Sequence, residues 1–188
     1  MIYLTTYDPT LNLSPENEKI NLISTHHMSA TIPDLEVTYP GLSIYSCSQT
    51  LLKQLDAEDV IVYLMTKNQE QGVTFEYHRF IAILQVLISW PSHEEALSWY
   101  KERVLTFPKY CFRPDSLVLE GNKIFHVCQK LYCQLSHPPF LTSLQMKKTF
   151  GFSELTDQLI EISQKKVDKL LEIVGQPVLQ ALIDAEKV

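Results

Sequence analysis

The sequence predicts an α+β protein in which strands and helices share the first two thirds of the chain and helices fill the rest. Runs of β-branched and aromatic residues bounded by turn residues, such as MIYLTTY at 1–7 and VIVYLM at 60–65, are typical of strands. Ser92 followed three residues later by Glu95 is typical of a helix start. The two kinds of signal alternate without an internal repeat, which favours a mixed fold.

A change of character after His137-Pro138-Pro139 suggests the domain organisation. Strand signals end there, and the segment 153–174 carries apolar residues at helical spacing up to Gly175, where we expect the helix to end. We therefore expect an α+β domain over 1–135 and a helical extension over 136–188 that packs on it. Residues 177–183, which begin with a proline, predict a last short helix.

The first half predicts these elements in order. Residues 1–7 and 20–25 are expected strands, and 35–39 is a short extended piece between prolines. The leucines at 51, 52 and 55 lie at helical spacing behind a serine-rich turn, so a short helix should precede the acidic turn at 56–59.

The middle of the chain predicts three further strands and a helix. Residues 60–65 are apolar throughout, which is typical of a strand buried on both faces. A long strand or bulged pair should span 73–90, followed by the Ser92 helix, which should end near Arg103. A short strand is expected at 116–119. The segment 124–135 fits both a strand and a helix, and its apolar spacing favours a helix.

Composition limits the function. With 45% apolar and 20% charged residues the chain should be globular. A formal charge of −6 argues against a protein that grips long duplex DNA or an anionic membrane. The longest apolar tract, 80–90, is too short to span a bilayer, and no secretory signal opens the chain. We therefore expect a cytoplasmic protein whose four cysteines are reduced thiols.

Motifs for catalysis and for metal binding are weak. Cys128 and Cys133 with His126 and His137 form a zinc set only on paper, because their intervals match no zinc-ribbon or finger pattern. The chain has no G-x-S-x-G, H-E-x-x-H, Walker or Rossmann motif. We expect no cofactor and no metal, and a binding role rather than an enzymatic one.

The segment Ser46 to Leu64, which includes DAEDVIVY at 56–63, resembles PUA-like domains of the EVE, ASCH, YTH and nucleotide-modification-associated families. In those domains a helix leads into a turn and a central barrel strand, and FIAILQV at 80–86 is similar to their next strand. The resemblance covers about Ile20 to Leu119. It departs from the family pattern at Glu58, which replaces the usual turn glycine.

This resemblance implies a small mixed or antiparallel β-barrel with flanking helices that holds a modified or flipped base in an aromatic-walled pocket. Such a base needs rings for stacking and polar groups for its edge. The residues expected to supply them are Tyr45, Ser46, Ser48, Gln49, Tyr63, His78, Arg79 and Trp90. Each ring also fits an ordinary core position.

The predicted function is therefore a nucleic-acid or nucleotide binding module that recognises a modified or flipped base, in a bacterial or phage modification or defence system. The alternative is a protein-interaction or oligomerisation protein that binds a partner, or a second copy, through residues 141–188. Some ASCH-like relatives hydrolyse modified nucleosides with lysine, threonine and glutamate, which Lys53, Thr50 and Glu76 would imitate here.

Overall fold

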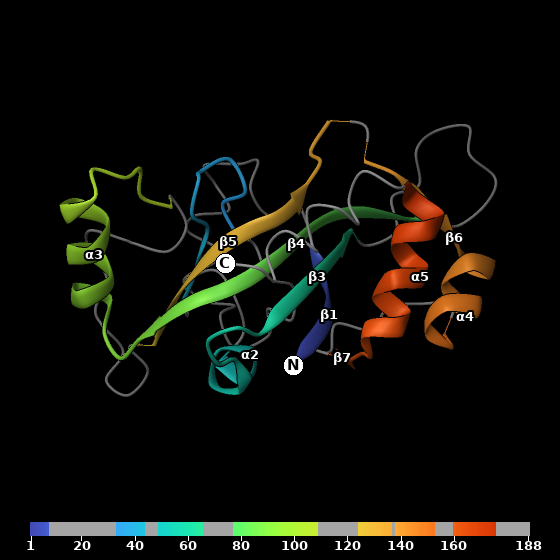
Figure 1. Ribbon diagram of the computed structural model, residues 1–188, viewed down its shortest axis with the longest axis horizontal. Coiled ribbons are helices and arrows are strands. Elements are labelled where there is room, and N and C mark those ends of the chain that lie inside the picture. Colours follow the sequence, from blue (N-terminus) through green and yellow to red (C-terminus); the bar gives the residue numbers. More distant parts are fainter. Residues whose placement is uncertain are drawn as a thin grey trace, which may run out of the picture. The chain divides into compact units, whose positions relative to one another are not determined.

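A computed structural model describes residues 1–7, 33–43, 49–65, 77–108, 124–136, 138–152 and 160–175 (Figure 1). Within these ranges it contains seven strands and four helices, which confirms the α+β class. The strands are β1 (Ile2–Tyr7), β2 (Gly41–Leu42), β3 (Val60–Met65), β4 (Tyr77–Trp90), β5 (Phe125–Cys133), β6 (Phe140–Thr142) and β7 (Ile160–Glu161). The helices are α2 (Gln49–Gln54), α3 (His93–Glu102), α4 (Ser143–Phe150) and α5 (Gln164–Val174).

The strands form one mixed sheet in the order β2-β5-β4-β3-β1-β7, with β6 pairing with β4 beside this path. Strands β1 and β3 are parallel, with Ile2 opposite Val60 and Tyr7 opposite Met65. The pairs β1–β7, β2–β5 and β4–β6 are antiparallel. Over the described ranges the sheet is open, so a closed barrel is not part of the observed fold.

The chain divides into two compact units. Unit 1 comprises 1–7, 60–84 and 131–188, and unit 2 comprises 8–59 and 85–130. Both are discontinuous in sequence, because β4 and β5 each contribute to both units. The predicted boundary at residue 136 stays a prediction.

Unit 1 has a mainly aliphatic core with two buried phenylalanines. Side chains from β1, β3, β4 and β6 pack against α4 and α5, and the buried members are Leu4, Val62, Leu64, Phe80, Ile83, Leu141, Met146, Phe150, Ile162, Val167, Leu170 and Leu171. Helix α4 starts with a full capping box, in which Thr142 Oγ1 accepts from the Gln145 N–H (3.2 Å) and Gln145 Oε1 accepts from the Thr142 N–H (2.8 Å). The capping box and the burial of its apolar residues therefore both stabilise helix α4.

Unit 2 contains an aromatic core cluster. The buried members of this cluster are Ala96, Trp99, Tyr100, Phe125 and Val127, and half-buried rings and aliphatic side chains surround them. Other buried residues of unit 2 are aliphatic, among them Leu42, Leu51 and Leu52. The rings meet mainly edge to face, with Trp99 and Tyr100 centroids 5.1 Å apart and Tyr39 and Trp99 centroids 5.5 Å apart. Such edge-to-face pairs add to the stability that burial alone supplies.

Several sequence predictions are confirmed. The strands at 1–7 and 60–65 are present as β1 and β3, and Ile61 to Leu64 of β3 are buried, as expected for a strand covered on both faces. The long strand ending at Trp90 is present as β4. Ser92 caps α3 by accepting from the Glu95 N–H (3.2 Å), and Arg103 is the C-cap.

Two predictions for the first 135 residues are wrong. Residues 35–39 form a turn and a bend rather than an extended piece, because the Asp34 carboxylate accepts from the Glu36 N–H (3.2 Å) and turns the backbone. The segment 124–135, for which a helix was favoured, contains strand β5. Its apolar spacing fitted both structures, and sheet pairing with β2 and β4 decides between them.

The acidic turn before β3 has the geometry that a glycine would suit. Glu58 has a φ of 74°, in the left-handed region, while its N–H donates to the Val86 carbonyl (2.8 Å). Asp59 closes the turn by accepting from the Asp56 N–H (2.9 Å). Glu58 therefore holds a backbone conformation that glycine adopts at less cost.

Other predicted elements, at 20–25, 116–119 and 177–183, lie outside the described residues. The same holds for 153–159, the first part of the predicted helix over 153–174. The prediction is wrong at Ile160–Glu161, which form strand β7 against β1, and right at 164–174, which are present as α5 and end at Gly175 as expected. No helix within the described ranges is long and apolar enough to cross a membrane.

Candidate functional site

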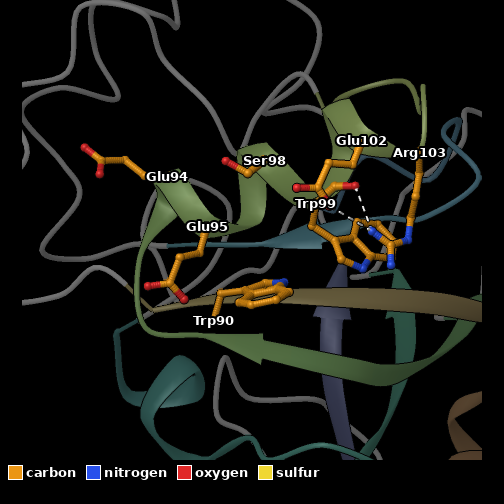
Figure 2. A pocket seen from close by; sticks show the side chains of 7 residues that line it. All are labelled: Trp90, Glu94, Glu95, Ser98, Trp99, Glu102 and Arg103. Carbon is orange, nitrogen blue, oxygen red and sulfur yellow. Dashed lines mark hydrogen bonds and ion pairs between the residues drawn. The ribbon is translucent and has the colours of Figure 1, made fainter.

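A wide-mouthed hollow lies in unit 2 between the end of β4 and helix α3, with a cavity volume of about 390 Å³ (Figure 2). We call it the α3 hollow. Trp90, the last residue of β4, forms one wall, and side chains of α3 and its C-cap form the rest. The lining residues are Trp90, Glu94, Glu95, Ser98, Trp99, Glu102 and Arg103.

Helix α3 lies close to the end of β4 because only Pro91 and Ser92 separate the strand from the helix. Ser92 caps the helix in extended backbone, so the helix turns back beside the strand that precedes it. Residue 98 lies four positions after 94, three after 95 and four before 102, the spacings that make neighbours on one helical face. That face carries the polar lining, while Ala96, Trp99 and Tyr100 pack into the core of unit 2.

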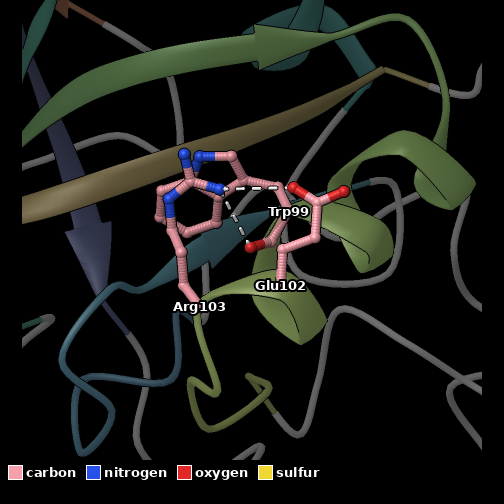
Figure 3. Close-up of polar contacts among 3 residues, drawn as sticks. All are labelled: Trp99, Glu102 and Arg103. Carbon is pink, nitrogen blue, oxygen red and sulfur yellow. Dashed lines mark hydrogen bonds and ion pairs between the residues drawn. The ribbon is translucent and has the colours of Figure 1, made fainter.

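The two tryptophans of the chain both line the hollow. Trp90 is half-buried, and its indole N–H is buried without a hydrogen-bond acceptor in the described part of the chain. Trp99 is only 8% exposed, because Tyr39 meets its ring edge to face and the Arg103 guanidinium lies 4.7 Å from its centroid (Figure 3). Indoles are the strongest stacking and cation-binding rings in proteins.

The charges of the lining are mostly negative. The lining contains three carboxylates, from Glu94, Glu95 and Glu102, and one guanidinium, from Arg103, which lies 3.8 Å from Glu102. His93, at the first position of α3, adds no positive charge at neutral pH, because burial lowers its pKa below 6.5. A negative hollow attracts cations and donor-rich edges and repels phosphate.

The end of α3 beside the hollow is locally unfavourable. Glu102 lies in the last turn, where the helix dipole disfavours a carboxylate. Val104 has a φ of 55°, which strains a β-branched residue, and it is 93% exposed. Its N–H donates to the Lys101 carbonyl (3.1 Å) and that of Leu105 to the Tyr100 carbonyl (3.0 Å), so a glycine-type cap forms without a glycine.

Of the residues that the sequence predicted for a base pocket, Trp90 is the one that the structure places in this hollow. Tyr45, Ser46 and Ser48 lie outside the described residues, and Gln49 is the first residue of α2. Lys53 of the proposed hydrolytic set is exposed on α2.

The other predicted site residues belong to unit 1. Tyr63 is fully buried in β3, and His78 is buried in β4 opposite Leu141 of β6. Arg79 is half-buried and, as the next residue along the strand, points to the other face. These three residues are placed as parts of the sheet and do not line the α3 hollow.

Sequence reasoning treated α3 as an ordinary amphipathic helix and so missed six of the seven lining residues. A signal was present: a tryptophan immediately before a capped helix, acids in its first turn, and Trp99 and Arg103 four residues apart. That spacing places a guanidinium beside a ring on one helical face.

A second polar constellation in unit 2 joins β4, β5 and α2. His126 is buried and lies 2.8 Å through Nδ1 from Ser89 Oγ and 2.9 Å through Nε2 from the Leu52 carbonyl. Because a carbonyl only accepts, Nε2 carries the proton and Nδ1 accepts from the Ser89 hydroxyl. Burial lowers the pKa of His126, against the opposing effects of the Leu52 carbonyl, Asp56 and Asp59.

The two cysteines and two histidines considered as zinc ligands from the sequence do not form a metal site where the structure describes them. His126 uses both ring nitrogens as above, Cys128 is buried and Cys133 is half-buried, while His137 lies outside the described residues. In the described ranges no group of three or more His, Cys, Asp or Glu residues is arranged to hold a metal ion.

Comparison of the chain with protein-family models, with curated proteins and with solved structures found no match. Because no relative suggests a function, the proposed function rests on the residues that line the α3 hollow.

Proposed function

We propose that the protein is a binding module that holds a nucleobase, modified or exposed, in the α3 hollow. The observation that carries this proposal is the joining of both tryptophans with three carboxylates around one cavity. An indole offers a stacking face for a base, worth about 1–3 kcal/mol per base. Carboxylates accept hydrogen bonds from the amino and imino groups of base edges.

The charge of the hollow narrows the ligand. Phosphate oxygens would meet Glu94, Glu95 and Glu102 with only Arg103 in opposition. We expect the base and its sugar to bind, with any phosphates directed away from the hollow. The site suits a nucleoside, or one base turned out of a strand, better than a nucleoside triphosphate.

The PUA-like barrel belongs to the same proposal. Its support is the order of β1, helix α2, an acidic turn and β3, with Glu58 in the left-handed conformation at the expected glycine position. An experimental structure in which further strands pair with the edge strands β2 and β7 would establish closure.

Intrinsic fluorescence gives a direct test, since every tryptophan of the chain lines the hollow. Nucleosides and the matching nucleoside triphosphates should be titrated at two salt concentrations. We expect saturable changes in emission with nucleosides and weaker binding of triphosphates, with the difference reduced at high salt. If neither class changes the emission, the proposed function is wrong.

The alternative, a partner-binding role for residues 141–188, has one observation in its favour. Leu144 of α4 is 61% exposed, and Phe140 of β6 next to this segment is 56% exposed. Against it, the apolar residues of α5 are used in the core of unit 1, so its outward face is polar. Light scattering of the protein and of Leu144→Lys tests it: a dimer that the variant dissolves would favour this role.

A further inference from the structure

The α3 hollow already contains a planar cation, and it comes from the chain itself. The Arg103 guanidinium carbon lies 4.7 Å from the centroid of the Trp99 ring. Its Nη1 donates to the Trp99 carbonyl at 3.4 Å and lies 3.8 Å from Glu102 Oε2, as the dashed lines in Figure 3 mark. The indole face in this hollow therefore has the shape and the potential to hold a flat, positively charged group.

Arg103 is held weakly. Its hydrogen bond to the Trp99 carbonyl is long, and its ion pair with Glu102 joins two exposed side chains. Ion pairs and cation–π contacts between exposed side chains contribute little to stability, because water and salt screen them. A ligand of similar chemistry can therefore replace Arg103 at little cost.

The hollow keeps negative charge when Arg103 is counted. Three carboxylates and one guanidinium leave a formal charge of −2 among the lining residues. If Arg103 swings out to solvent, the Trp99 face is vacated and the remaining charged residues of the lining are Glu94, Glu95 and Glu102. Strain at the adjacent Val104 means that a rearrangement of the last turn also releases an unfavourable backbone conformation.

From these contacts we infer that the hollow recognises a planar organic cation, namely a nucleobase made positive by alkylation of a ring nitrogen, which takes the place of Arg103 on the Trp99 face. The inference rests on the proposed base-binding function and specifies its ligand. A neutral base would lose the cation–π attraction, and a non-planar ammonium would lose the stacking area.

The test compares 1-methyladenosine, which is cationic at neutral pH, with neutral adenosine by tryptophan fluorescence of the full chain. Both are nucleosides, so phosphate repulsion does not enter. We expect 1-methyladenosine to bind at least about fivefold more tightly. Arg103→Gln should strengthen binding of 1-methyladenosine about two- to fivefold, because it removes the internal competitor.

Lys101→Gln is the matched control. It removes one positive charge from the same helix, and Lys101 is exposed and does not line the hollow. If Lys101→Gln and Arg103→Gln strengthen binding equally, the change in net charge alone explains the effect. The inference that the ligand takes the place of Arg103 on the Trp99 ring is then wrong. Thermal unfolding of both variants should verify that each is folded.

The outcomes separate this inference from the proposed function. Equal binding of adenosine and 1-methyladenosine would overturn the inference and leave base binding standing. If no nucleoside binds, base binding is wrong and the inference falls with it. Binding of arginine amide in that case would show that the hollow takes guanidinium groups from another source.

Discussion

Helices α3 and α5 each bury three residues, yet they do so with different chemistry. Helix α5 buries Val167, Leu170 and Leu171 in the aliphatic core of unit 1. Helix α3 buries Ala96, Trp99 and Tyr100 in the aromatic core of unit 2, and its remaining face lines a cavity. Burial therefore accounts for the apolar pattern of α5, whereas the acids and the half-buried Trp90 beside α3 require another explanation.

The C-terminal ends of α4 and α3 also differ, in how well their residues suit the backbone conformation. Helix α4 ends at Gly151, whose φ of 94° costs a glycine little. The end of α3 instead places Val104 at a φ of 55° and Glu102 against the helix dipole. Local choices that oppose the fold are expected at functional sites, and the proposed site at α3 has two of them at its C-terminal end.

The largest expected effect is on unit 1. Phe80 is fully buried and its ring stacks on Tyr132 with centroids 4.5 Å apart. Phe80→Ala should lower the free energy of unfolding by about 3–5 kcal/mol through lost burial and a new cavity. Chemical denaturation measures it. A loss below about 1 kcal/mol would contradict the assignment of Phe80 to a rigid core.

Trp90→Ala separates the core interpretation from the site interpretation. The ring is half-buried against the aromatic cluster, so we expect a loss of about 1–3 kcal/mol of stability, less than for a fully buried ring. Binding of nucleosides should weaken by about tenfold or more, because a stacking face is lost. Calorimetric titration should be used, since the variant lacks one reporter. Unchanged binding would remove Trp90 from the site.

His126→Gln should lower stability by about 1–3 kcal/mol near neutral pH, because buried partners at Ser89 and Leu52 lose well-placed bonds. It should also reduce the pH dependence of stability. The folded protein lowers the pKa of His126 below 6.5, so below that pH the unfolded chain binds more protons and stability falls on acidification.

Denaturation curves at pH 7 and pH 5 measure this loss. Burial lowers the pKa of His93 in the same direction, so the variant should keep part of the dependence. A variant with the full wild-type dependence would show that His126 does not contribute.

The helix caps provide a matched pair. Ser92 Oγ accepts from the Glu95 N–H, whereas Ser163 at the start of α5 makes no side-chain capping bond. Ser92→Ala should cost about 1 kcal/mol and Ser163→Ala only a few tenths. Thermal melting of both variants compares the two helices directly. Equal losses would mean that the Ser92 bond contributes nothing.

The smallest effect should be a gain. Val104→Gly relieves the left-handed strain at the end of α3 and should stabilise the protein by about 0.5–1 kcal/mol, with the added chain entropy of glycine offsetting part of the relief. Gly151→Ala, at the end of α4, is the reverse control and should destabilise by a similar amount. If Val104→Gly weakens nucleoside binding as well, the strained end of α3 takes part in recognition.

Local sequence determined the elements whose signals need no distant partner. The apolar run of β3, the Ser92 cap of α3 and the end of α5 at Gly175 were predictable because capping, chain stiffness and burial on both faces act within a few residues. The α+β class followed from the same signals.

Only the tertiary structure decided the rest. Strand β5 was mistaken for a helix because its apolar spacing suits both, and the pairing with β2 and β4 is a long-range choice. The α3 hollow depends on Trp90 from a strand and Trp99 from a helix lining one cavity, with Arg103 folded over the second ring. The sequence showed two tryptophans and five charged residues within 90–103, and the packing of α3 beside the end of β4 brings both rings and four of these charges into one lining.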